Sequence, residues 1–108
     1  ILIFSLCYSS YAKVYKDKKN QESIILKRKH KTVGQECAKN LTACFEEIKR
    51  VKTTKIKLDK VKKDERNCVK NTGKIVTLTS PSGSKQKFCV LSGKYQILLE
   101  EYNTYHQK

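Results

Sequence analysis

The spacing of hydrophobic side chains changes along this 108-residue chain. From Val33 to Val51 they recur every three or four residues, which predicts an amphipathic helix. Over residues 74–79 and 85–91 they alternate, with many β-branched side chains, which predicts two strands. The sequence SPSG between these strands favours a turn, so the two strands together predict a hairpin.

Two further helices are predicted, one on each side of this amphipathic segment. The first begins at Asn20, which can cap it, and cations gather at its C-terminal end. The hydrophobic residues Ile24–Leu26 would equally suit a strand, which is the alternative for this segment. The second begins at Asp59, a possible cap, and Gly73 suits the position just past its end.

The C-terminal segment continues the sheet. Tyr95, Ile97 and Leu99 alternate and predict a third strand, followed by a helical turn that carries Tyr102 and Tyr105. The predicted fold class is therefore α+β, with N-terminal helices followed by a small antiparallel sheet made of the hairpin and the third strand.

The first residues are typical of a secretory signal. The apolar run Ile1–Leu6 gives way to small and polar residues, with Ser10 and Ala12 placed as at a cleavage site, and it is too short to cross a bilayer. We expect residues 1–12 to be a signal-peptide remnant of an exported protein; a buried first strand is the alternative. The rest is expected to form a basic, largely helical segment over 13–58 and a disulfide-pinned helix-hairpin domain over 59–108.

Cleavage after Ala12 removes Cys7 and leaves four cysteines, an even number that predicts a disulfide framework in an exported protein. In a regular helix, Cys37 and Cys44 lie about 10 Å apart, too far for a disulfide, which needs roughly 4.4–6.8 Å. Two arrangements remain. Cys68 pairs with Cys89 while the helix cysteines are packed thiols or a possible second pair, or crossed bridges join the helix to both.

Composition points to a small core and a strongly basic surface. Hydrophobic residues make up 38% of the chain and the net charge is +14, so disulfides are expected to assist the core. The first 74 residues hold 20 Lys/Arg against 8 Asp/Glu, a balance of +12. Lysine outnumbers arginine 21 to 3, which favours non-specific charge attraction over bidentate phosphate recognition.

The candidate binding residues are cations grouped in the first 63 residues. We predict that they bind a polyanion, either an anionic glycan, a lipid surface or nucleic acid, although a merely solubilising charge is the alternative. The predicted residues are Lys27, Arg28, Lys29, Lys31, Lys49, Arg50, Lys52, Lys55, Lys57, Lys60, Lys62 and Lys63.

No catalytic, metal or cofactor site is predicted. His30 and His106 lack patterned partners, and no nucleophile elbow, phosphate loop or zinc-protease motif occurs. The spacing of Cys37 and Cys44 does not match that of zinc fingers. We therefore expect a protein that is not an enzyme.

The segment from Cys68 to Tyr105 resembles a small exported bacterial domain of unknown function that is labelled a haemolysin. Thr72 replaces the first glycine of that family's Gly-Gly pair, Ser92 stands in place of its Pro-Asp, and Tyr102 replaces its tryptophan. The matching positions are Cys68, Gly73, Ile75, Gly83, Cys89, Leu91, Gly93, Glu100, Glu101 and Tyr102. The resemblance implies export to an oxidising compartment such as the periplasm and pairing of Cys68 with Cys89, and it implies no activity.

The chain is also similar, more weakly, to chemokines, which place cysteines, strands and a C-terminal helix in this order. That similarity implies a secreted signalling ligand for a receptor and glycosaminoglycan, and it implies the pairs Cys37–Cys68 and Cys44–Cys89. Our leading hypothesis is a small exported, non-enzymatic envelope or secreted protein, binding or structural, whose lysine-rich face contacts a polyanion.

Overall fold

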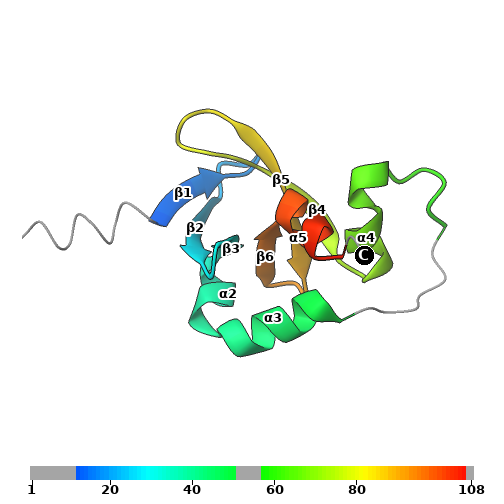
Figure 1. Ribbon diagram of the computed structural model, residues 1–108. Coiled ribbons are helices and arrows are strands. Elements are labelled where there is room, and N and C mark those ends of the chain that lie inside the picture. The colour runs from blue at the N-terminus through cyan, green and yellow to red at the C-terminus, as the bar shows by residue number, and fades with distance from the viewer. Residues whose placement is uncertain (1–11, 51–56, 107–108) are drawn as a thin grey trace, which may run out of the picture.

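The computed structural model describes residues 12–50 and 57–106, and in these the chain forms a closed antiparallel barrel (Figure 1). The strand order around the barrel is β1-β2-β3-β6-β5-β4. The strands are β1 (Ala12–Lys16), β2 (Glu22–Arg28), β3 (Lys31–Gly34), β4 (Lys74–Thr79), β5 (Lys85–Leu91) and β6 (Tyr95–Leu98). The helices are α2 (Gln35–Lys39), α3 (Leu41–Lys49), the 3-10 turn η1 (Lys63–Glu65), α4 (Arg66–Lys70) and α5 (Leu99–Tyr105).

The barrel consists of two three-stranded meanders, β1–β2–β3 and β4–β5–β6. Within each meander, neighbouring strands pair over four to six residues. Between the meanders, the described residues contain one register pair at each seam, Lys16 with Thr79 and Val33 with Ile97. Backbone pairing therefore holds each meander together, and side-chain packing must contribute most of what joins them.

Two groups of buried side chains provide that packing. The smaller, which we call the barrel cluster, consists of Tyr15, Ile25, Leu78 and Phe88, and so joins both meanders. The larger, which we call the stapled cluster, contains both cysteine pairs and lies between the helices and β5–β6. Its members are Val33, Cys37, Cys44, Ile48, Cys68, Cys89, Leu91, Tyr95, Ile97, Leu99 and Tyr102.

The predicted amphipathic helix is interrupted at Asn40, which separates α2 from α3. The Asn40 backbone N–H donates to the Cys37 carbonyl, and its side-chain oxygen accepts a hydrogen bond from the Ala43 N–H at 3.3 Å, as an N-cap does. The break brings the Cα atoms of Cys37 and Cys44 to 5.1 Å, and the two residues form a disulfide. The expectation that a regular helix keeps them apart was therefore wrong.

The predicted α+β class with N-terminal helices was also wrong. The segment from Asn20 that we expected to be helical forms β2 and β3, because its hydrophobic run alternates between the two faces of the sheet. Ile25 is 2% exposed inside the barrel, whereas Ile24 beside it is 38% exposed outside. The basic segment 13–58 is thus not largely helical in its described part, since three of the strands belong to it.

The second half of the chain agrees better with the prediction. The hairpin of β4 and β5, the third strand and the C-terminal helical turn are all present. The helix expected from Asp59 is shorter, because η1 begins only at Lys63 and α4 at Arg66. The predicted signal-peptide remnant lies outside the described residues, except for Ala12, which begins β1.

Cys68 and Cys89 form a disulfide that joins α4 to β5, with Cα atoms 5.8 Å apart. Gly73 packs directly against it. A Cβ at this position would lie 2.6 Å from the Cys68 sulfur and 2.8 Å from the Cys89 sulfur. Glycine is therefore required here by the close approach of the backbone to the disulfide.

Candidate polyanion-binding site

The turn between β2 and β3 presents cations at its tip. Arg28 pairs with Lys31 across the hairpin, which leaves Lys29 and His30 as a two-residue loop. Both have positive φ, 50° and 65°, as a type I′ turn requires. Because Asn and Gly normally occupy such positions, the backbone of this Lys-His turn is strained.

Residues of α3 and α5 meet this turn. Lys29 Nζ lies 5.6 Å from the centre of the Phe45 ring, and Lys31 and Lys49 line a small hollow with Phe45 and Tyr105. We call Lys29, Lys31, Phe45, Lys49 and Tyr105 the Phe45 patch. Phe45 and Lys49 are one helical turn apart, so α3 places them on one side. Phe45 is partly buried there against the stapled cluster, to which Cys44 and Ile48 of the same helix belong.

The lysines of the Phe45 patch lack acidic partners in the part of the chain that the structure describes. The neighbouring cations do have them. Lys27 Nζ lies 3.9 Å from a Glu101 oxygen, and Arg50 lies 3.2 Å from Glu47. The Phe45 patch therefore combines uncompensated positive charge with a half-buried aromatic ring and the Tyr105 side chain, which is 38% exposed.

His106 connects the C-terminal helix to the end of α3. Its Nε2 donates a hydrogen bond of 2.6 Å to the Ile48 carbonyl, and its ring contacts those of Tyr102 and Tyr105, with centroids 4.5 and 5.6 Å away. These contacts position Tyr105 within the Phe45 patch. Sequence reasoning missed this role because 58 residues separate His106 from Ile48 along the chain.

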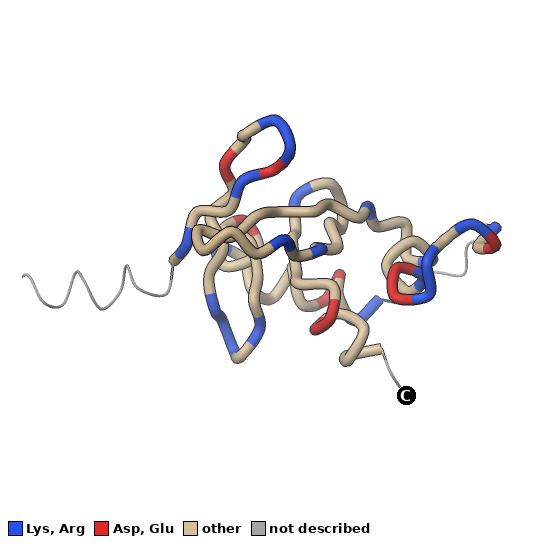
Figure 2. The backbone as a smooth tube through the Cα atoms, turned by 90° about the horizontal axis from the view of Figure 1, so that it is seen from above, with Lys and Arg blue, Asp and Glu red and all other residues tan. Residues whose placement is uncertain are grey.

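The predicted cations do not form one continuous face. Lys27, Arg28, Lys29 and Lys31 gather on the β2–β3 hairpin, and Lys49 and Arg50 stand at the end of α3. Lys57, Lys60, Lys62 and Lys63 precede α4 at the opposite end of the molecule (Figures 1 and 2). Lys52 and Lys55 lie outside the described residues.

The two groups of cations also differ in their surroundings. In Figure 2 the β2–β3 turn is blue without red, whereas blue and red alternate near α4. There Asp64 and Glu65 bind Lys87 at 3.2 and 2.8 Å. Their hydrogen bonds raise the pKa of the Lys87 ammonium above its ordinary value. The stronger candidate for anion binding is therefore the Phe45 patch.

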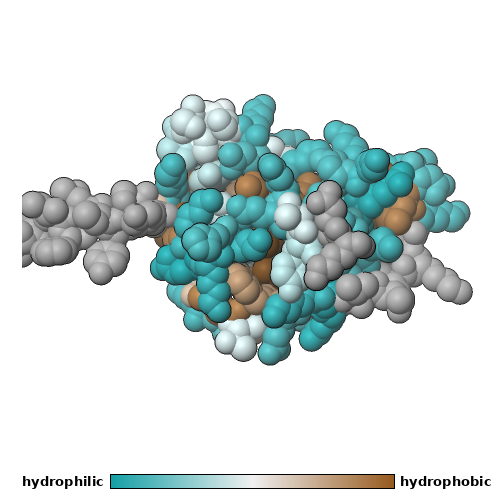
Figure 3. Space-filling model, in the orientation of Figure 1, coloured by the Kyte–Doolittle hydropathy of each residue, from teal (hydrophilic) through white to brown (hydrophobic). Residues whose placement is uncertain are grey.

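Other kinds of site find less support in residues 12–50 and 57–106. His, Cys, Asp and Glu side chains do not gather in threes there as a metal site would need, and the cysteines described are all disulfide-bonded. None of the helices in those ranges has the length and hydrophobicity that crossing a bilayer takes. The face seen in Figure 3 is mostly hydrophilic, with small separate hydrophobic areas.

No family model, curated protein or solved structure matches the chain. The resemblance to the haemolysin-labelled domain therefore stays a prediction, although the pair that it implied, Cys68–Cys89, is present. The pairing that would have favoured a chemokine-like protein, Cys37 with Cys68 and Cys44 with Cys89, is not the one that forms.

Proposed function

We propose that this protein is a non-enzymatic binding protein that attaches to a polyanion through the Phe45 patch. The observation that carries the proposal is the convergence of Lys29, Lys31 and Lys49 around Phe45 without acidic partners among the described residues. Because like charges repel, such a cluster is stabilised when an anion binds to it.

The chemistry of the patch supports a polymer held by charge. Ammonium groups act as point charges and attract many anions, whereas selective phosphate recognition favours the planar guanidinium of arginine. The strained Lys-His turn adds support, since local backbone strain concentrates at functional sites.

The location that we propose is an oxidising one, either the periplasm or the extracellular space. Two buried disulfides in a chain with few hydrophobic residues support this, because small domains in oxidising compartments commonly depend on such bonds. The resemblance to the haemolysin-labelled domain points the same way.

A charge-matched pair of variants tests the proposal. The patch variant is Lys29→Gln/Lys31→Gln/Lys49→Gln, and the control is Lys18→Gln/Lys19→Gln/Lys85→Gln, which removes the same charge from exposed positions elsewhere. Affinity for heparin and for DNA is measured as a function of salt. The patch variant should lower the slope of log K against log salt by about three, roughly one per lysine, and the control should change it little.

Two results contradict the proposal. If the wild-type protein binds neither heparin nor DNA at low salt, it does not bind polyanions. If both triple variants lose affinity equally, net charge alone explains the binding and the Phe45 patch has no special part in it.

A further inference from the structure

A second hollow, of about 460 Å³, lies between the first meander and β5, β6 and α5. We call it the barrel groove. Its volume is in the range of small-ligand sites. Its polar lining consists of Lys13, Tyr15, Lys27, Thr32, Gln86 and Glu101, and its apolar lining of Ile25, Leu26 and Leu98. None of these residues belongs to the Phe45 patch.

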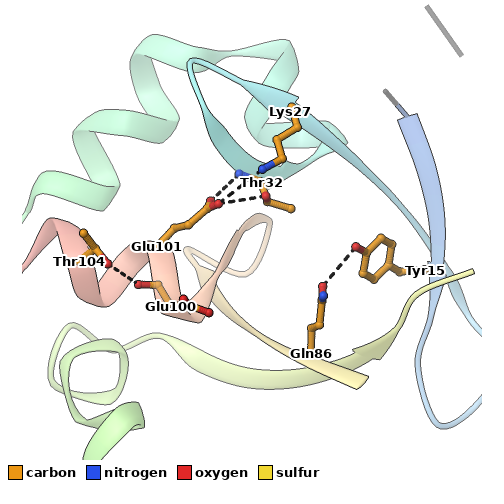
Figure 4. A network of polar contacts seen from close by, with 7 residues as sticks. All are labelled: Tyr15, Lys27, Thr32, Gln86, Glu100, Glu101 and Thr104. Atoms are coloured by element: carbon orange, nitrogen blue, oxygen red, sulfur yellow. Dashed lines mark hydrogen bonds and ion pairs between the residues drawn. The ribbon is translucent and has the colours of Figure 1, made fainter. Parts of the chain in front are cut away.

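The polar groups stand on two sides of the groove (Figure 4). On one side the Tyr15 hydroxyl donates to the Gln86 side-chain oxygen at 3.2 Å. On the other, the Glu101 carboxylate accepts from the Thr32 N–H and, at 3.1 Å, from the Thr32 hydroxyl, and it pairs with Lys27. These bonds fix the side chains before any ligand arrives, as a preorganised site requires.

The contacts leave hydrogen-bonding capacity free. An ionised carboxylate offers about four acceptor positions, and that of Glu101 contacts three groups, the Thr32 N–H, the Thr32 hydroxyl and the Lys27 ammonium. The Gln86 amide has two N–H donors besides the oxygen that binds Tyr15. Donors, acceptors and ammonium groups thus surround a short aliphatic floor.

The side chains that line the groove suit one of the three candidate anionic partners, which are a lipid, a nucleic acid and an anionic glycan, better than the other two. A lipid chain would need a continuous apolar wall, but six of the nine residues that line the groove are polar and Ile25 is only 2% exposed. A nucleic acid would meet the Glu101 carboxylate near its phosphates and would lack an exposed stacking platform, since Tyr15 is 7% exposed. An acidic sugar suits it, with hydroxyls for Gln86 and Glu101 and an acid group for Lys13.

We infer that the barrel groove binds one acidic saccharide unit, so that the polyanion on the Phe45 patch is an anionic glycan. This inference rests on the proposed function. Lys27 lines the groove, whereas Lys29 and Lys31 of the same hairpin line the patch, so one extended glycan can contact both sites.

The test compares two probes of equal formal charge, a heparin hexasaccharide and an oligothymidylate, on the full chain by calorimetry. The groove variant is Tyr15→Phe/Gln86→Leu, which keeps the edge-on packing of the Tyr15 ring against Phe88 at 5.6 Å. It should bind the hexasaccharide about tenfold more weakly, because hydrogen bonds are lost, and the oligothymidylate within about twofold of wild type. The patch variant should bind both probes more weakly.

Each failure has a distinct meaning. Wild-type affinity of the groove variant for both probes, or an equal loss for both, overturns the saccharide site but leaves the proposed function intact. Unchanged binding by the patch variant overturns the proposed function. Tyr15→Phe alone retains the Gln86 side chain, and it should reduce hexasaccharide affinity by about threefold even if the double variant does not fold.

Discussion

The two meanders of the barrel have the same strand pattern but are attached to the rest of the molecule differently. The second meander carries Cys89, whose disulfide ties β5 to α4, and it supplies Leu91, Tyr95 and Ile97 to the stapled cluster. Neither disulfide involves a residue of the first meander, which contributes Val33 to that cluster. The strands with a covalent anchor are thus also those with the larger buried core.

This difference shows how a chain with few hydrophobic residues closes a barrel. Hydrogen bonds between neighbouring strands build each meander locally, and one register pair per seam adds little across the described residues. The barrel cluster, in which Tyr15 and Ile25 meet Leu78 and Phe88, must therefore hold the first meander against the second. Four predictions test this comparison of the two halves, in order of decreasing expected effect.

Phe88→Ala should break the contact between the meanders. Phe88 is fully buried and its ring packs edge-on against Tyr15 on the opposite side of the seam. Truncation of a buried phenylalanine costs about 4 kcal/mol of unfolding free energy, measured by urea denaturation. Val76→Ala is the control, since Val76 pairs with Phe88 but is only partly buried. A similar small loss for both variants would mean that the barrel cluster does not join the halves.

Removing each disulfide in turn should show that the Cys68–Cys89 bond, which anchors the second meander, contributes more to the unfolding free energy than the Cys37–Cys44 bond does. Cys68→Ala/Cys89→Ala opens a crosslink with a sequence separation of 21 and should cost about 3 kcal/mol of unfolding free energy. Cys37→Ala/Cys44→Ala opens one of 7 and should cost about 2.5 kcal/mol, because a shorter loop restricts the unfolded chain less. Denaturant titration checks the order, and the reverse order would contradict the view that the second meander depends on its anchor.

Tyr102→Phe tests the stapled cluster through its pH dependence. Burial raises the pKa of the Tyr102 hydroxyl above its ordinary value of 10.0, although the hydrogen bond from Asn71 opposes this. Above pH 10.0 the unfolded chain loses this proton first, so stability falls as pH rises. The phenylalanine variant should lose about 1 kcal/mol at neutral pH and show a weaker decline in alkali. If the wild-type protein and the variant lose stability equally as the pH rises, ionisation of Tyr102 does not cause the decline.

Thr72→Gly should stabilise the start of the second meander. Thr72 has a φ of 61°, which a β-branched residue rarely adopts, just before β4 begins. Glycine relieves this strain and loses the hydroxyl bond to the Asn71 carbonyl, so we expect a net gain of about 1 kcal/mol in thermal denaturation. Thr72→Ser keeps the hydroxyl and a Cβ atom at this positive φ, and it should change stability less.

The sequence predicted the second meander because its signals are local. Alternating residues surround Pro81 and Gly83, and Gly83 has the positive φ expected in the turn. The first meander was missed for two reasons. Ile24–Leu26 form an unbroken hydrophobic run, and its turn is Lys29-His30, where a hairpin usually shows Asn-Gly or Asp-Gly.

The sequence predicted the cations of the candidate site, but it did not predict which of them lie close together. Lys29, Lys31 and Lys49 are visible as basic residues in any reading of the chain, but their meeting at Phe45 depends on contacts between distant segments. The chain turns back from β3 through α2 and α3 to place Phe45 beside the hairpin, and the His106 contact brings Tyr105 to the same place. No local pattern encodes such contacts.

The glycine at position 73 has a consequence for the descent of this protein. Since the sulfur atoms of Cys68 and Cys89 occupy the space that any larger residue would need, we expect the three positions to be inherited as one unit. Homologous chains should keep all three together or lose them together. A homologue with a bulky side chain here would have to arrange its helix and strand differently.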